Sequence, residues 1–175
     1  MTGKTDIASL LRETVIAARP ALLAIPESRA REKASPAAWS FEEILGHLAD
    51  SAANNHQRIV RMQETQDIGR FVYTQEHWVA AQRYNAEPWR DLVEFWSSYN
   101  MHIAHVIGGI DPAALHNLCD MGYARPATLE FVVEDYLRHV RHHLEQILAE
   151  VPPGKTTVWV PREPPGPADT PPQGA

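Results

Sequence analysis

Four segments of the chain carry hydrophobic residues at helical spacing, and this pattern limits the possible folds more than any other feature. The segments span residues 6–25, 41–63, 88–107 and 128–149. Within each one, apolar side chains return every three or four positions, so one face of the helix is apolar and has to be covered. No convincing strand pattern accompanies them. The sequence therefore predicts an all-α protein built as a four-helix bundle.

Residues at the ends of these segments support the helix boundaries. Ser40 precedes the second segment and Glu43 follows three positions later, which is the pattern of a capping box. Pro88 suits the first position of the third helix, while Gly108 and the glycine after it end that helix. Thr128 can cap the fourth helix. Each boundary thus has a local cause of its own.

Three parts of the chain depart from this simple plan. Pro20 lies inside the first segment, where its missing N–H donor is expected to kink or divide the helix. Residues 64–87 are long for a connection and rich in aromatic side chains. We expect them to fold over the domain, with a short helix at residues 76–84. A helical turn is expected at residues 113–118.

Length and composition indicate one domain followed by a tail. A chain of 175 residues is long enough for one full core. We assign residues 1–150 to the bundle domain. Residues 151–175 are dominated by proline and glycine, and we expect this tail to be disordered. The net charge of −6 and the scattered basic residues argue against nucleic acid as a partner.

The sequence also predicts a cytoplasmic protein with no membrane partner. The first residues lack the charged and apolar regions of a signal peptide, and no apolar stretch approaches the length of a membrane span. Cys119 is the single cysteine, so an internal disulfide is impossible, which suits a reducing compartment. An aspartate and no cation lies beside Cys119, so we interpret its thiol as structural rather than as a nucleophile.

Three histidines form a candidate metal site. His139 and His143 stand four residues apart in the fourth segment, and His47 lies in the second. Four residues on a helix advance about 6 Å and turn only about 40° past a full turn, so both imidazoles can reach one ion. A third imidazole from a facing helix would leave an open position, as in catalytic zinc sites. The alternative is that each histidine is a hydrogen-bonded core or surface residue, since nine histidines produce such a spacing easily by chance.

Three stretches of the chain resemble the DinB/YfiT-like superfamily of small helical bundles. They are residues 39–51 (WSFEEILGHLADS), residues 139–147 (HVRHHLEQI) and a middle region at residues 78–89 (WVAAQRYNAEPW). The resemblance covers roughly residues 6–150, and its motifs are specific when taken together. It implies a four-helix bundle in which His47, His139 and His143 hold a divalent metal, zinc or nickel. It also implies a homodimer.

The same resemblance suggests an activity. Some members of the superfamily are S-transferases that use a low-molecular-weight thiol such as bacillithiol or mycothiol, and a related branch isomerises maleylpyruvate. We therefore expect a metal-dependent enzyme that activates such a thiol cosubstrate for S-transfer to a small electrophilic substrate. The alternatives are a metal-dependent hydrolase, a non-catalytic metal- or ligand-binding bundle with a role in stress responses, and a dimeric scaffold whose histidines are relics.

Asp50, Asn54 and Arg58, which follow His47 along the same helix, are further candidates for the site. Asp50 could orient the His47 ring through its second nitrogen, or it could be an exposed carboxylate. Asn54 and Arg58 could recognise a carboxylate or amide of the substrate, a task for which the arginine side chain is suited. The alternative for these two residues is a solvated helix face. The chain need not supply a nucleophile in either reaction, because the thiol or a water molecule provides it.

Overall fold

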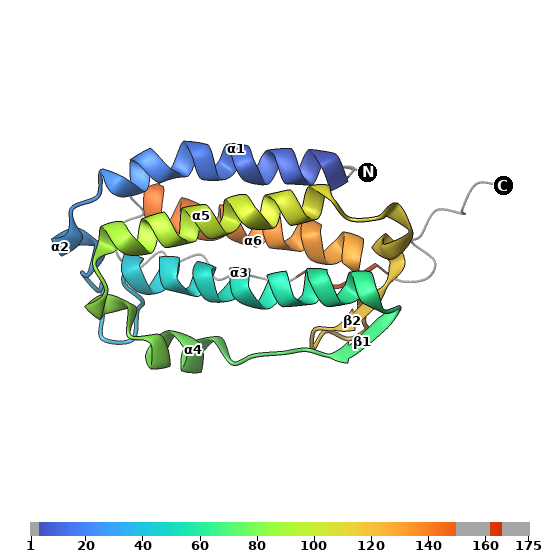
Figure 1. The fold of residues 1–175 in the computed structure, drawn as a ribbon. Helices are drawn as coiled ribbons and strands as arrows, with labels where there is room; N and C mark the ends of the chain where they lie inside the picture. Colours follow the sequence, from blue (N-terminus) through green and yellow to red (C-terminus); the bar gives the residue numbers. More distant parts are fainter. Residues whose placement is uncertain (1–3, 150–161, 166–175) are drawn as a thin grey trace.

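The four long helices are present and form a bundle (Figure 1). The computed structural model describes residues 4–149 and 162–165. Helices α1 and α3 each pack against both α5 and α6, so α1 lies diagonally opposite α3. The predicted fold class is confirmed. The bounds of the long helices are α1 (Lys4–Leu23), α3 (Phe41–Glu64), α5 (Trp89–Gly108) and α6 (Leu129–Leu148).

The apolar faces of these helices meet along the bundle and form its core. Trp96 of α5 and Tyr136 of α6 are its largest fully buried side chains. The Tyr136 hydroxyl donates a hydrogen bond to Asn100 Oδ1, so the polar end of this ring is not left unpaired. The other large side chains that are fully buried are Leu11, Leu22, Leu45, Leu48, Ile59, Met62, Leu92, Ile103, Ile107 and Ile110.

Most helix boundaries follow the predicted local signals. Ser40 Oγ accepts from the Glu43 N–H at 3.1 Å and the Glu43 carboxylate accepts from the Ser40 N–H at 2.9 Å, so the capping box is complete. Thr128 Oγ1 accepts from the Phe131 N–H at 3.2 Å. The expected division of α1 at Pro20 is wrong. Pro20 stands in the last turn of α1, where its missing N–H removes one bond and little helix follows.

A small three-stranded sheet lies at one end of the bundle (Figure 1), although the sequence predicted no strands. β1 (Asp67–Arg70) pairs in parallel with β2 (Leu118–Asp120), which pairs antiparallel with β3 (Ala127–Thr128). Strands of two to four residues are too short to produce a recognisable alternation of apolar and polar positions. The sheet ties the connection that follows α3 to the connection that precedes α6.

The chain between β1 and α5 runs back along α3, and we call residues 71–86 the strap (Figure 1). It contains α4 (Gln75–Gln82) and the short 3-10 helix η1 (Tyr84–Ala86), close to the predicted helix at residues 76–84. The Tyr84 ring lies where a Cβ on Gly46 would stand. Its hydroxyl donates a hydrogen bond of 2.7 Å to Asp50 Oδ1. Gly46 therefore sets how closely the strap approaches α3.

The remaining described segments are short. α2 (Glu27–Ala30) lies between α1 and α3, and the 3-10 helix η2 (Pro112–His116) lies near the predicted turn before β2. The predicted disorder of the tail concerns residues that lie, apart from 162–165, outside the described part of the chain. Within that short segment, Glu163 Oε2 accepts a hydrogen bond of 3.2 Å from the Ala124 N–H. Among the described residues, no helix is both long and apolar enough to cross a membrane.

Replacing Gly46 by alanine should destabilise the protein, because the new Cβ would overlap the Tyr84 ring. Overpacking of this kind typically costs about 1–3 kcal/mol, and we expect urea denaturation to show a free energy of unfolding lower by that amount. Gly108→Ala is the matched control, since its Cβ would meet nothing nearer than Ala8 Cβ at 3.7 Å. Equal loss in the two variants would contradict the close packing of the strap on α3.

Candidate metal centre

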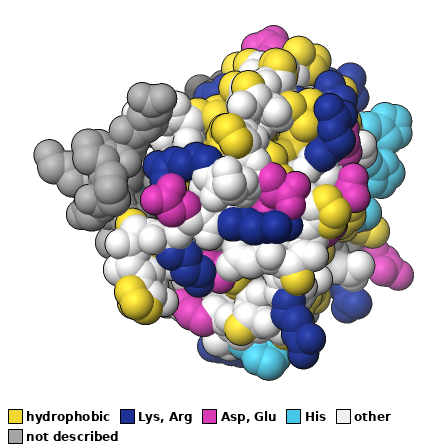
Figure 2. Space-filling view, turned by 90° about the vertical axis from the view of Figure 1, so that its left-hand side faces the viewer, with side chains coloured by type: hydrophobic (Ala, Val, Ile, Leu, Met, Phe, Trp, Pro, Cys, Tyr) yellow, Lys and Arg dark blue, Asp and Glu magenta, His cyan; other side chains and the backbone are white. Residues whose placement is uncertain are grey.

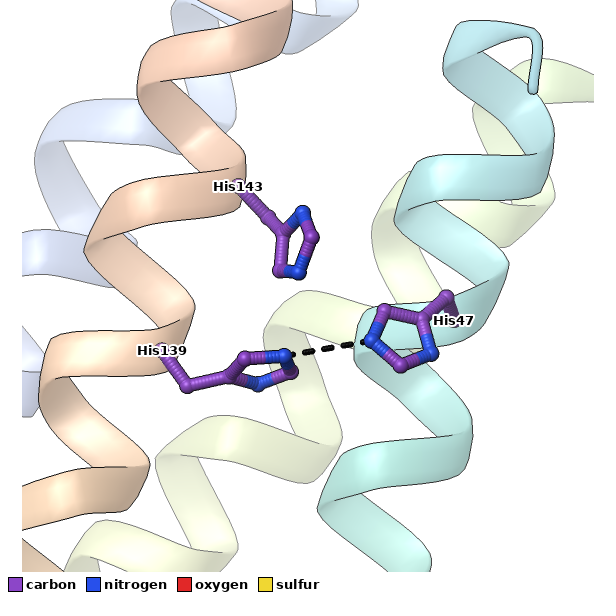
Figure 3. Close-up of side chains that lie close together, drawn as sticks. All are labelled: His47, His139 and His143. Atoms are coloured by element: carbon purple, nitrogen blue, oxygen red, sulfur yellow. Dashed lines mark hydrogen bonds between the residues drawn. The ribbon is translucent and has the colours of Figure 1, made fainter. Parts of the chain in front are cut away.

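Three imidazole rings converge between α3 and α6 (Figure 3). His47 comes from α3, and His139 and His143 come from successive turns of α6. His47 and His143 are buried, while His139 is partly buried. His47 and His139 are 92 residues apart in the chain. The packing of α3 on α6 thus brings together the histidines that the sequence singled out.

The distances between the rings suit a single cation. One ring nitrogen from each histidine lies within 4.8 Å of the others, and His47 Nε2 is 3.1 Å from His139 Nε2. Nitrogens bound to one zinc at about 2.0–2.1 Å in tetrahedral geometry lie about 3.3 Å apart. Small rotations of the side chains would therefore put all three nitrogens on one ion. Elsewhere in the described part of the chain, no three histidine, cysteine or acidic residues are grouped in this way.

All three rings are neutral at physiological pH. Burial, with a smaller contribution from His143, lowers the pKa of His47 to about 3. Burial also lowers the pKa of His143 to about 4, even though its hydrogen bond to Gln146 acts in the opposite direction. The pKa of His139 lies well below its ordinary value, chiefly because of burial and then because of the neighbouring His143. Neutral imidazole is the form that binds divalent metals.

Hydrogen bonds behind the rings orient two of them. His143 Nδ1 lies 2.7 Å from Gln146 Oε1, which can only accept, so Nδ1 carries the proton and Nε2 keeps its lone pair. Ser51 Oγ lies 3.2 Å from His139 Nδ1. Such partners commonly fix the tautomer and orientation of metal-binding histidines. Both residues are therefore part of the candidate site, although the sequence analysis did not identify them.

Asp50 has neither of the two roles considered from the sequence. It is buried rather than exposed, and its Oδ1 accepts hydrogen bonds from Tyr84 and Gln82 of the strap region. Its Oδ2 and His47 Nδ1 are both buried without a hydrogen-bond partner among the described residues. Burial raises the pKa of Asp50 to about 6. In the described geometry Asp50 fastens the strap to α3 and does not orient the His47 ring.

The donor set fits a divalent metal. Three neutral imidazoles suit zinc and nickel, and no carboxylate is needed in the same shell. A hydrogen bond between His47 Nε2 and His139 Nε2, which lie 3.1 Å apart, joins only two of the three rings, so it does not explain why His143 converges on the same point. A cation at the centre of the three rings would use the lone pair of each.

A cavity of about 480 Å³ is lined by two of the three histidines, His47 and His139. Its volume lies in the range typical of small-molecule sites. Helix α3 contributes a row of side chains that starts at His47 and continues through Ser51 and Asn55 to Arg58. The strap, the β2–β3 connection and α6 supply the other lining residues, which are Val72, Tyr73, Thr74, Gln75, Glu76, Met121, Tyr123, Val132, Asp135, Tyr136 and His139.

Neither Asn54 nor Arg58 lies on a solvated helix face, so that alternative is wrong. Both side chains are buried. Asn54 donates a hydrogen bond of 2.9 Å to the Asp50 carbonyl and does not line the cavity. Arg58 does line it. Of Asp50, Asn54 and Arg58, Arg58 alone therefore has access to a ligand in the cavity.

The residues that the sequence analysis missed fall into two kinds. Ser51 stands four positions after His47 and Gln146 stands three after His143, so helical spacing could have identified them. Tyr73 and Tyr123 come from connections without periodicity, and no local signal points to them. They line the cavity because the small sheet holds these connections beside α3 and α6.

Comparison with known proteins places the chain in a family. Residues 10–147 match the DinB superfamily, and the chain belongs to it. Among solved structures the chain is similar to YfiT from Bacillus subtilis, described as a probable metal-dependent hydrolase with an unusual four-helix bundle topology. The two have 15% sequence identity and a TM-score of 0.74 over 84% of each chain, which establishes a shared fold. A comparison with curated proteins gives no match.

The metal-free protein should lose stability as the pH falls from 7 to 4. Unfolded histidines take up protons near pH 6.5, whereas His47 and His143 stay neutral in the folded protein down to about pH 3 and 4. The unfolded state therefore binds more protons in this interval, and the free energy of unfolding falls. Asp50, with its pKa raised to about 6, opposes part of the loss.

Urea denaturation at several pH values measures this effect. His143→Asn should flatten the dependence on pH, while His116→Asn, which replaces an exposed histidine, controls for the loss of one imidazole. A wild-type stability that is constant between pH 7 and 4 would contradict the neutral buried triad.

Proposed function

We propose that His47, His139 and His143 hold one divalent cation, zinc or nickel, and that the protein is a metal-dependent enzyme acting on a small molecule. The observation that carries this proposal is the convergence of three neutral imidazoles beside a cavity of about 480 Å³. Three protein ligands leave a coordination position open, as catalytic sites do and structural sites do not. Membership of the DinB superfamily is consistent with it.

We further propose that the nucleophile is the thiol of a low-molecular-weight cosubstrate. A divalent cation bound here would lower the pKa of a thiol or a water molecule at its open position, producing a nucleophile at neutral pH. The chain's own thiol, Cys119, is fully buried and does not line the cavity. Burial also raises the pKa of Cys119. The reacting sulfur must therefore come from a second small molecule.

Residues of the cavity would bind and orient the reactants. Burial raises the pKa of Tyr73 to about 12, so it keeps its phenolic proton and can donate a hydrogen bond to a substrate oxygen. Tyr123 is also protonated, but its hydroxyl donates to Asp135 Oδ2 at 3.3 Å. Ser51 and Gln146 hold two of the imidazoles in place. The strap lines one side of the cavity with Tyr73 and Val72, which would contact a bound substrate.

Hydrolysis is the second candidate. It is favoured by the structural similarity to YfiT, which is described as a probable metal-dependent hydrolase. The same open position would then activate water rather than a thiol, and the Tyr73 hydroxyl would contact the carbonyl oxygen of an ester or amide. The two reactions need the same cation and differ in the nucleophile, so an assay with and without thiol separates them.

Replacing any one of the three histidines by alanine should reduce metal affinity by more than the roughly 10- to 100-fold typical of losing an outer hydrogen-bond partner. Metal analysis measures the metal content of protein made without a histidine tag, and calorimetric titration measures its metal affinity. Zinc should also raise the melting temperature of the wild type, because it binds the folded state. His116→Ala is the matched control, since this exposed histidine neither lines the cavity nor belongs to the triad. Unchanged metal content in His139→Ala would contradict the proposed ligands.

The metal-loaded protein should form a thioether from a small thiol and 1-chloro-2,4-dinitrobenzene, with release of chloride. Absorbance and mass spectrometry measure the adduct, and chelation of the metal or His143→Ala should abolish it. A parallel assay follows hydrolysis of 4-nitrophenyl acetate without thiol. Ester cleavage with no adduct from any thiol would favour the hydrolase. If neither product forms, the result would favour a non-catalytic binding protein.

A further inference from the structure

Arg58 is a buried cation in the wall of the cavity. Its side chain is 4% exposed, and it lies on α3 in line with His47, Ser51 and Asn55. Burial lowers its pKa, but a guanidinium is not deprotonated in proteins, so the charge remains. A buried charge is costly unless an opposite charge or good hydrogen bonds compensate for it. Whether the charge of Arg58 is available to a ligand therefore depends on the groups that contact it.

The hydrogen bonds of Arg58 reach only neutral groups. Its Nε and Nη2 donate to the Phe71 carbonyl at 3.2 and 2.8 Å, and its Nη1 donates to Asn55 Oδ1 at 3.1 Å. No carboxylate forms an ion pair with it within residues 4–149 and 162–165. These bonds fasten the start of the strap to α3, and they leave the positive charge without a counter-charge.

The ionisable groups closest to Arg58 do not supply a counter-charge. Burial raises the pKa of the Cys119 thiol, and it raises the pKa of Tyr73 and of Tyr123 to about 12. All three are therefore protonated and neutral at physiological pH. The guanidinium lowers each of these pKa values, but not enough to offset burial.

The two carboxylates that line the cavity are engaged or exposed. Asp135 accepts a hydrogen bond of 2.8 Å from Arg138 and one of 3.3 Å from the Tyr123 hydroxyl. Glu76 is exposed and accepts from Gln75 at 3.0 Å. An anion that enters the cavity would therefore meet the buried guanidinium of Arg58, which has no counter-charge among the residues that the structure describes.

We propose that Arg58 binds the carboxylate of an extended small-molecule ligand whose other end reaches the three histidines. His47 and Arg58 are separated by about 16 Å along α3, at about 1.5 Å per residue. The Arg58 side chain reaches back to Asn55, so the distance to be spanned is roughly 10–15 Å. A guanidinium carries one positive charge, so a carboxylate would balance it, whereas a phosphate dianion would keep an excess negative charge. This inference rests on the proposed metal and thiol chemistry, because it assigns the second end of the same ligand.

A series of thiols of increasing length tests the inference on the cobalt-loaded protein. The probes are ω-mercaptoalkanoates, from 3-mercaptopropionate to 11-mercaptoundecanoate, and the ω-mercaptoalkanols of the same lengths. Binding of each thiolate to cobalt is followed by its charge-transfer absorption. At the lengths that span the cavity we expect the carboxylate to bind about 10- to 100-fold more tightly than its matched alcohol. The shortest pair should bind equally.

Variants of Arg58 and of Arg61 show which arginine causes the preference for carboxylate. Arg58→Met should abolish the preference for carboxylate while the alcohols bind as before, and Arg58→Lys should keep part of it. Arg61→Met is the matched control, because Arg61 is exposed and also lies over the Phe71 ring, at 5.7 Å compared with 5.4 Å for Arg58. The control should keep the full preference.

Each contrary outcome has a separate meaning. Equal affinity of acid and alcohol at every length in the wild type would overturn the inference without any variant. This test therefore remains valid even if Arg58→Met fails to fold. A preference that survives in Arg58→Met, or tighter binding of an ω-mercaptoalkylphosphonate, would also overturn it. Absence of cobalt binding, or of a thiolate band with every probe, would contradict the proposed function and this inference with it.

Discussion

The packing of α3 against α6 is the interaction on which the candidate site depends. It buries His47 against His139 and His143, and burial keeps all three rings in the neutral form that can bind a metal. The apolar faces of the same helices provide the free energy that holds these polar groups out of water. The site is thus a consequence of the core, since separating the two helices by one side-chain layer would remove the common centre of the three rings.

The cavity depends on a second arrangement, in which irregular segments are held beside the bundle. The strap is fixed to α3 at one end by Tyr84 on Asp50 and at the other by Arg58 on the Phe71 carbonyl. The small sheet holds the β2–β3 connection next to it. These segments supply tyrosines and apolar side chains to the walls beside the histidines, so the candidate centre lies at a cavity rather than on an open helix surface.

Sequence reasoning succeeded where one residue's neighbours along the helix determined the outcome. The capping box of Ser40 and Glu43 formed as predicted because both partners lie within one turn. His139 and His143 share a face for the same reason. The reasoning failed where a distant segment intervened. Asp50 is buried by the strap, and Arg58 is buried by Phe71 and its neighbours, although both were considered for exposed positions. The two- to four-residue strands depend on pairing between distant segments, which no local pattern records.

The sequence by itself determined that four amphipathic helices would form and that three histidines could meet, because helical periodicity fixes which side chains share a face. It also carried the motifs of the DinB superfamily. Only the tertiary structure decided which helices are neighbours, with α3 beside α6 and diagonal to α1. The tertiary structure alone also decided that Arg58 is a buried cation facing a cavity. Burial and charge pairing are set by contacts between segments far apart in the chain, and such contacts leave no period in the sequence.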